Sequence, residues 1–198
     1  MGLIFQYKNG QTPISEEAKQ CLLVPSITTQ GELDQFEQRN ISLAHKWLLS
    51  QRVDTAKLTS EGFIRKLYHE MYGQVWSWAG NSRTTETNIG VPFYQISIEL
   101  KQLLDDAKHW FDHEVYDPDE LAIRFKHRLV SIHCFPNGNG RHSRLIADLI
   151  VEKIFGGTYF SWGGSELITD NEIRKRYIHA LQEADRGSYD SLIAFARS

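Results

Sequence analysis

The side chains best suited to chemistry lie together in one short segment, residues 133–144, which reads His-Cys-Phe-Pro-Asn-Gly-Asn-Gly-Arg-His-Ser-Arg. Gly138 and Gly140 flank Asn139 just before a stretch with helical periodicity. Glycine lets successive backbone N–H groups turn toward one point, and a helix that begins there adds unpaired N–H donors and a partial positive charge. The spacing therefore predicts an anion-binding loop at a helix N-terminus.

Three charged or titratable side chains flank this loop. Arg141 and Arg144 are three residues apart, so on a helix they lie on neighbouring parts of one face. Two guanidinium groups beside such a loop match a di- or triphosphate. His133 ends the preceding apolar stretch, and its imidazole can take a proton from an attacking hydroxyl near neutral pH. Together these residues predict phosphoryl or nucleotidyl transfer, in which positioning and charge neutralisation do most of the catalytic work.

Each of these features also has a plainer interpretation. A Gly-Asn-Gly sequence alone is usually a turn, one histidine beside a loop is more often structural, and two arginines on a helix usually face solvent. Their combination within one short segment favours the functional interpretation.

The periodicity of apolar residues predicts the elements that position this segment. Helical spacing covers residues 32–50, a helix that starts at Glu61, and residues 96–115, 118–133, 141–155, 170–184 and 189–196. Between Val75 and Tyr94, β-branched residues and turn residues indicate a small β-hairpin. We expect a mainly α, single-domain helical bundle over residues 31–198, preceded by an irregular N-terminal arm, residues 1–30.

The composition excludes several classes of protein. The 198 residues carry a formal net charge of −3, which argues against direct nucleic-acid binding over a broad surface. Only two cysteines occur, Cys21 and Cys134, so no disulfide framework is expected and a reducing compartment is the default. No run of about 18 apolar residues indicates a membrane span, and the first residues lack the apolar centre of a signal peptide. We therefore expect a cytoplasmic protein that does not bind membranes.

The segment also resembles a known family. It is similar to the Fic (Fido-fold) signature, His-x-Phe-x-(Asp/Glu)-Gly-Asn-Gly-Arg-x-x-Arg, at every fixed position but one. Trp78-Ala79-Gly80 with Arg83 resembles the stretch before the family's target-binding flap, and the C-terminal helix is represented by Tyr177, Ala180, Leu181 and Ala184. The resemblance covers most of residues 32–196. The length and the arm are similar to the bacterial branch called mobile mystery protein B, found on mobile elements beside a helix-turn-helix partner.

This resemblance implies a Fido-fold bundle with a β-hairpin flap and a protein adenylyltransferase (AMPylase) activity. AMP would pass from ATP to a Ser, Thr or Tyr hydroxyl of a target protein, with His133 as the general base and Phe135 as the anchor of the loop. The implied nucleotide- and phosphate-binding residues are Asn137, Gly138, Asn139, Gly140, Arg141, Arg144 for the γ-phosphate, and Tyr177 at the nucleoside.

The flap implied by the resemblance is the hairpin, residues 84–94. It would register the target segment by strand addition, through Thr87, Asn88, Ile89 and Gly90. The target protein, the modified residue, the preferred nucleotide and the oligomeric state do not follow from the sequence.

The departure from the signature is Asn137, where the family has an acidic residue that binds Mg²⁺. An amide oxygen brings no charge and is a poorer ligand for a hard cation. Three outcomes are open: weaker Mg²⁺ binding, a metal held mainly by the phosphates, or altered chemistry, and we favour the second. The alternatives to AMP transfer are a Fic-fold phosphotransferase and a non-catalytic binding module of a toxin–antitoxin-like pair.

Fic enzymes are often inhibited by a glutamate in the motif (Ser/Thr)-x-x-x-Glu-(Gly/Asn), which pairs with the second arginine of the signature. Thr28-Thr-Gln-Gly-Glu32 fits its first five positions, but Leu33 replaces the small residue. Under this hypothesis Glu32 pairs with Arg144 and blocks the γ-phosphate. In the alternative, Glu32 caps its own helix with Thr28 or Thr29, and restraint comes from an antitoxin-like partner.

Overall fold

Short polar side chains determine where the helices begin. The computed structural model describes residues 13–164 and 171–198. In it the Thr29 hydroxyl accepts the backbone N–H of Glu32, while the Glu32 carboxylate accepts the backbone N–H of Thr29. This capping box starts α2 (Gln30–Leu49), and the Ser60 hydroxyl caps α4 (Glu61–Tyr72) in the same position.

The remaining elements follow in chain order. They are α1 (Glu16–Lys19), α3 (Thr55–Leu58), η1 (Phe93–Gln95), α5 (Ile96–Asp112), α6 (Pro118–Ile132), α7 (Asn139–Leu149), the π-helical turn η2 (Ile150–Ile154), α9 (Asn171–Asp185) and α10 (Asp190–Arg197). The seven predicted helices are confirmed to within a few residues. In the helix predicted over residues 141–155, the hydrogen bonding changes from α-type to π-type after Leu149. The short helices α1 and α3 were not predicted, because a four-residue helix has no apolar period to read.

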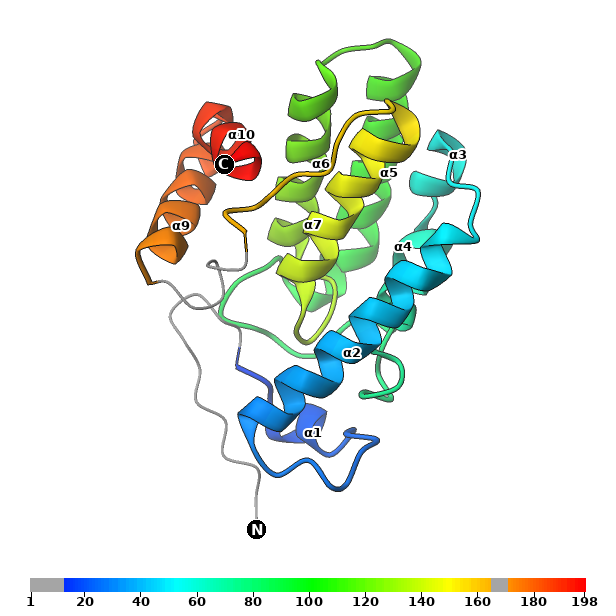
Figure 1. Ribbon diagram of the computed structural model, residues 1–198, viewed down its shortest axis with the longest axis vertical. Coiled ribbons are helices and arrows are strands. Elements are labelled where there is room, and N and C mark those ends of the chain that lie inside the picture. Colours follow the sequence, from blue (N-terminus) through cyan, green and yellow to red (C-terminus); the bar gives the residue numbers. More distant parts are fainter. Residues whose placement is uncertain (1–12, 165–170) are drawn as a thin grey trace.

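The chain is mainly α-helical, and its helices pack in pairs (Figure 1). α2 contacts α4, α5 contacts α6, α6 contacts α7, and α10 contacts both α9 and α6. In Figure 1 the α9–α10 pair lies on one side of α6 and α7, with α2 and α4 on the other. None of the helices in the described residues combines the length and the apolar character needed to cross a bilayer.

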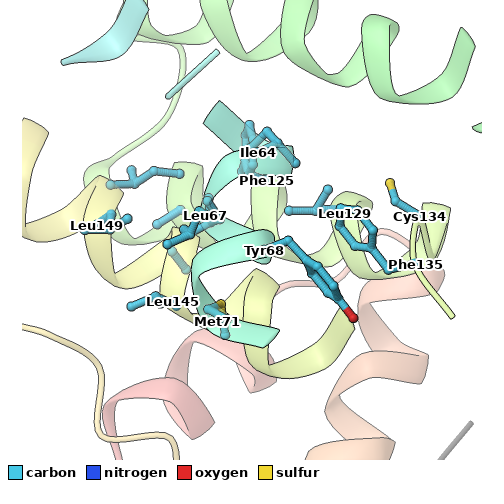
Figure 2. Close-up of a cluster of buried hydrophobic side chains, with 14 of the residues drawn as sticks. Ile64, Leu67, Tyr68, Met71, Phe125, Leu129, Cys134, Phe135, Leu145 and Leu149 are labelled. Carbon is cyan, nitrogen blue, oxygen red and sulfur yellow. The ribbon is translucent and has the colours of Figure 1, made fainter. Parts of the chain in front are cut away.

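A central part of the core fills the space between α4, α6 and α7 (Figure 2). Its side chains are buried, and those labelled in the figure are Ile64, Leu67, Tyr68, Met71, Phe125, Leu129, Cys134, Phe135, Leu145 and Leu149. Each buried apolar side chain of this size contributes roughly 1.5–3 kcal/mol to folding. The loop between α6 and α7 places Cys134 and Phe135 in this core. Packing of these two side chains therefore fixes the position of the loop.

The predicted hairpin over residues 84–94 is not formed. The described residues contain no β-strand, and the isolated bridge they do contain joins Leu22 to Trp76. The backbone near the expected hairpin bonds elsewhere: Arg83 N–H donates to the carbonyl of Cys134 at 2.9 Å, and Val91 N–H donates to that of Ile132 at 3.4 Å. The segment therefore pairs with the loop after α6 rather than with itself.

The N-terminal arm is only partly irregular. Its residues 1–12 lie outside the described part of the chain, and its remainder contains α1, capped by Ser15. Leu23 N–H donates to the carbonyl of Val75 and Ser77 N–H to that of Cys21, so the arm is tied to the segment that follows α4.

Candidate active site

Two residues in left-handed backbone conformation bracket the loop between α6 and α7. His133 is the C-cap of α6 with φ 56°, and Gly138 is the N-cap of α7 with φ 73°. A Cβ atom on Gly138 would lie 2.7 Å from Cζ of Tyr72. Gly138 is therefore required both by the backbone conformation and by the close approach of the Tyr72 ring.

The side chain of Asn139 closes this loop. Its Oδ1 accepts the N–H of Phe135 at 3.0 Å, and its Nδ2 donates to the carbonyl of Phe135 at 2.7 Å. With both amide groups bonded and the side chain buried, Asn139 braces the loop. Because both polar atoms of the Asn139 side chain are bonded within the loop, the backbone N–H of Asn139 is the group that remains for a phosphate.

Two tyrosines of α4 support the loop from behind. The ring of Phe135 stacks on that of Tyr68, with centroids 3.7 Å apart. The Tyr68 hydroxyl donates to the carbonyl of Asn137, and the Tyr72 hydroxyl donates to that of Gly138 at 3.5 Å. Burial raises the pKa of both phenols, so they stay protonated donors. The sequence interpretation missed them, although their spacing of four residues places them on one face of the helix.

The start of α7 presents unpaired backbone donors. The first bond of the helix joins His142 N–H to the carbonyl of Gly138 at 3.0 Å, so the N–H groups of Asn139, Gly140 and Arg141 have no partner within the helix. A Cβ atom on Gly140 would meet nothing within 4 Å. The Cβ side of Gly140 is therefore uncrowded, and the helix start carries the positive end of the helix dipole, which favours an anion.

The imidazole of His133 is buried and oriented by the helix that it ends. Its Nδ1 lies 3.3 Å from the carbonyl of Val130, which can only accept, so Nδ1 carries the proton and the lone pair is on Nε2. Burial, opposed by the Val130 carbonyl and aided by the charge of Arg83, lowers the pKa of His133 to about 4. The ring is therefore neutral at physiological pH, as a general base requires.

Arg83 holds the predicted flap segment, residues 84–94, against His133. Its Nε donates to the His133 carbonyl at 2.7 Å, its Nη1 to the carbonyl of Thr85 at 2.9 Å, and its Nη2 to that of Val91. The side chain is almost fully buried, at 3% exposure. The resemblance had named Arg83 without a role, and the structure identifies it as the clamp of the flap segment.

The predicted target-binding residues occupy the outer part of this segment. The Thr87 hydroxyl donates to the carbonyl of Ile89 at 2.6 Å, while Asn88 and Ile89 lie at the surface. Gly90, with φ 114°, approaches so closely that a Cβ atom there would lie 2.6 Å from Cβ of His133. The structure thus brings Gly90 and His133 together although they are far apart in sequence.

Arg141 is paired in this structure. Its Nη2 lies 2.7 Å from Oε2 of Glu37 on α2, and its guanidinium lies 5.2 Å from the centroid of the Tyr72 ring. Glu37 is 3% exposed and also accepts the indole N–H of Trp76 at 2.7 Å. Burial alone would lower the pKa of Arg141, but Tyr72 and Glu37 raise it, so the guanidinium stays charged.

Glu37 was missed by the sequence interpretation, although it carried a signal. It occupies the buried face of α2 among apolar residues such as Leu33 and Ile41. A carboxylate at an interior position needs a partner, and Arg141 supplies it.

Arg144 lies beside Tyr177, with its guanidinium carbon 5.8 Å from the centroid of the phenol ring. The two residues come from α7 and α9, and the structure brings them together as one part of the site. The hypothesised pair of Glu32 with Arg144 is not formed. Instead, the Glu32 carboxylate accepts the N–H groups of Thr28 and Thr29 at 2.8 and 3.0 Å, because a helix start offers unpaired donors closer by.

The loop does not by itself provide a Mg²⁺ site. Oδ1 of Asn137 accepts the N–H of Gly138 at 2.6 Å, and within the described residues no group of three His, Cys, Asp or Glu side chains could hold a metal ion. Mg²⁺ in proteins is usually bound by one or two carboxylates together with phosphates and water. The donor set at Asn137 does not fit that pattern.

Comparison with known proteins shows similarity to one family. The chain is 31% identical over 121 residues to protein adenylyltransferase fic-1 of Caenorhabditis elegans, covering 59% of this chain and 22% of the relative. It is 25% identical over 159 residues to protein adenylyltransferase Fic of Drosophila grimshawi, covering 78% of this chain and 31% of the relative. The chain therefore spans less than a third of the length of these curated relatives.

Solved structures share the fold. Fic-1 (residues 134–508) from C. elegans superposes with a TM-score of 0.68 at 23% identity, covering 88% of this chain and 50% of that chain. The BepC protein of Bartonella tribocorum, solved with bound AMPPNP, superposes with a TM-score of 0.65 at 16% identity. The match covers 86% of this chain and 87% of that chain. The Fic/DOC family model matches residues 58–151, which include the loop, both arginines and the flap segment. Over residues 58–151 this chain is thus similar to the Fic/DOC family.

Proposed function

We propose that the chain is a protein adenylyltransferase that transfers AMP from ATP to a Ser, Thr or Tyr hydroxyl of a target protein. One observation carries the proposal: a neutral, buried His133 and the open start of α7, with Arg141 and Arg144 on its first turns, stand at the two ends of one braced loop. The curated relatives are named protein adenylyltransferases, which supports AMP transfer over other nucleotide chemistry.

In the proposed reaction the target hydroxyl oxygen attacks the α-phosphorus of ATP. A new oxygen–phosphorus bond forms, the bond to the β-phosphate oxygen breaks, and pyrophosphate leaves. Nε2 of His133 takes the hydroxyl proton, since Nδ1 already carries one. The N–H groups at the start of α7 would stabilise the charge that develops on the phosphates.

Binding of ATP would require a change at Arg141. The guanidinium now pairs with Glu37, so a phosphate has to replace or share that carboxylate. Arg144 would take the γ-phosphate, and Tyr177 beside it would border the nucleotide. Since the Asn137 amide lacks charge, we propose that Mg²⁺ is held mainly by the phosphates of ATP.

Restraint of the activity is proposed to act through α2. Glu37 forms an ion pair with Arg141, whereas the Glu32 carboxylate caps the start of its own helix. An antitoxin-like or helix-turn-helix partner is the alternative source of restraint, and the resemblance to the mobile-element branch is its support.

The test is transfer of label from ATP to protein. We expect α-phosphate label, but no γ-phosphate label, to appear on protein, and His133→Ala to abolish it while His113→Ala at the end of α5 retains it. Label from the γ-phosphate alone would instead indicate a phosphotransferase. Absence of both labels, also after Glu37→Gln, would favour a binding module.

A further inference from the structure

Two segments that lie far apart in the sequence line one groove of about 610 Å³. One is the N-terminal arm, through α1 and the residues beside it, and the other is the stretch 82–88, which leads into the flap segment. Pro136, from the loop that follows His133, also lines the groove. The groove therefore adjoins the loop that carries the proposed base.

The arm is held in place beside this groove. The indole N–H of Trp78 donates to the carbonyl of Ala18 at 3.2 Å, and the backbone N–H of Ser77 donates to that of Cys21 at 3.0 Å. These bonds attach α1 and the turn after it to the segment that runs into the flap. An occupant would therefore meet a groove that is already formed, which lowers the entropy cost of binding.

The flap side of the groove offers hydrogen-bonding groups to an added segment. Within residues 13–164 and 171–198, the backbone N–H groups of residues 84–88 donate no hydrogen bond. The hydroxyl oxygen of Ser82, on the same side, is buried and has no hydrogen-bond partner. A strand added along this segment can accept from the free N–H groups, so affinity from main-chain bonds is available here.

The charge on the groove is mainly negative. Glu17 of α1 and Glu86 of the flap segment both line it, and both are exposed. Among the described residues that line it, the cation is Arg83, whose guanidinium already bonds to three backbone carbonyls and lies 3.7 Å from Glu86. Hydrogen bonds from its own backbone N–H and from the Ser15 hydroxyl lower the pKa of Glu17, so its carboxylate stays ionised.

We propose that this groove binds the target protein and selects segments that carry a Lys or Arg close to the modified hydroxyl. The inference rests on the proposed function and deepens it, because it names the class of target for the same site. The segment pairs with the backbone of the flap, and its basic side chain lies near Glu17 and Glu86. Main-chain bonds then supply affinity that is independent of sequence, and the two carboxylates supply the preference for a basic side chain.

A purely structural role of Glu17 makes a different prediction. An acidic residue in the first turn of a helix is stabilised by the helix dipole, so Glu17 could serve α1 alone. In that case its removal would lower stability and change the affinity for every target segment equally. Glu86 lies outside any helix, so this alternative does not apply to it.

The experiment measures binding of three synthetic peptides to the full chain by fluorescence anisotropy. The peptides share a central Ser-Thr-Tyr sequence and carry Lys, Gln or Glu at the same flanking positions. We expect the Lys peptide to bind about fivefold more tightly than the Gln peptide at low salt, and the Glu peptide to bind most weakly. The preference should decline as the NaCl concentration rises, because exposed charges are screened.

Substitutions then locate the preference on the groove. Glu17→Gln and Glu86→Gln should each reduce the preference for the Lys peptide by about twofold and leave the affinity for the Gln peptide unchanged. Glu16→Gln is the matched control, since it removes the same charge from the same helix at a residue that does not line the groove. Thermal unfolding of each variant records any change in stability.

Equal affinity of the native chain for the Lys and Gln peptides, or failure to bind either, would overturn the inference. So would equal effects of Glu16→Gln and of the two groove variants. If Glu17→Gln melts early, Glu86→Gln still decides. Transfer of α-label from ATP is measured on the same peptides: selective binding without label on any peptide or protein would overturn the proposed function, whereas label without preference for the Lys peptide would overturn the inference.

Discussion

The carboxylate of Glu37 lies 2.7 Å from the guanidinium of Arg141 and joins α2 to the first turn of α7. The carboxylate is buried and also accepts the indole N–H of Trp76. The same arginine is assigned to the phosphates of ATP, so the pair couples the position of α2 to occupancy of the site.

Replacing the Glu37 carboxylate by an amide should change ATP binding and protein stability in opposite directions. Glu37→Gln can keep a bond to Trp76 but loses the charge that holds Arg141. We expect tighter ATP binding and faster AMP transfer, with a free energy of unfolding lower by roughly 1–3 kcal/mol. Titration calorimetry and thermal unfolding measure the two effects, and unchanged ATP binding would contradict the assignment of Arg141.

The matched change at Glu32 should affect stability alone. Glu32→Ala removes the carboxylate of the capping box, which costs about 0.5–2 kcal/mol. The expected result is earlier melting with an unchanged rate of auto-modification by α-labelled ATP. An increase as large as that in Glu37→Gln would support the inhibitory hypothesis for Glu32 instead.

The rate of transfer should depend on pH through His133. The base acts in its neutral form, so the rate rises as the pH passes upward through its pKa, which burial has lowered to about 4. Between about pH 6 and about pH 8 we therefore expect a flat profile, with the acid limb well below the ordinary value of about 6.5. Single-turnover labelling measures the profile, and an acid limb centred near that ordinary value would contradict the neutral, buried base.

Unfolding in acid needs a control in that experiment. Burial lowers the pKa of His142 to about 3, and that of His133 is lowered as well. The unfolded chain takes up these protons near pH 6.5 and the folded chain only at lower pH, so stability falls as the pH drops below that value. Circular dichroism at each pH establishes which points report on folded protein.

The contact between Gly90 and His133 predicts a large effect from one methyl group. In Gly90→Ala the new Cβ would lie 2.6 Å from Cβ of His133 and 2.8 Å from Nη2 of Arg83. Either the flap segment or the imidazole must move, and we expect at least about a tenfold loss of transfer. Gly62→Ala is the control, since its Cβ meets nothing within 4 Å. Equal transfer by the two variants would show that the contact is dispensable.

A carboxylate at position 137 should change the dependence on metal. Asn137→Asp adds the charged ligand that Mg²⁺ prefers, so half-maximal transfer should require several-fold less Mg²⁺ than in the native chain. A titration with Mg²⁺ at saturating ATP measures the shift. The proposal that the phosphates hold the ion in the native chain fails if the two chains respond identically.

Much of the site could be predicted from sequence because its parts are close in sequence. The periodicity placed a helix before His133 and another from Arg141. Glycine, arginine and histidine at these spacings indicate phosphate chemistry without reference to the rest of the chain. The same local rules found the long helices, since each has a clear apolar face.

The contacts that complete the site could not be predicted because they join distant residues. Periodicity rules treat a charged residue as solvent-facing, so Glu37 was overlooked, although it lies on a buried helix face. The hairpin was predicted from β-branched residues, but the Arg83 side chain bonds to the carbonyls of Thr85 and Val91, which a paired strand would have used.

Arg83 has a consequence for selectivity. One guanidinium bonds to the backbone of the proposed base and to both limbs of the segment proposed to receive the target. A protein that seats poorly on that segment would pull on the arginine and turn the imidazole away from its hydroxyl. Poor substrates should then bind but react slowly. The protein would discriminate among targets in the rate of the catalytic step rather than in affinity.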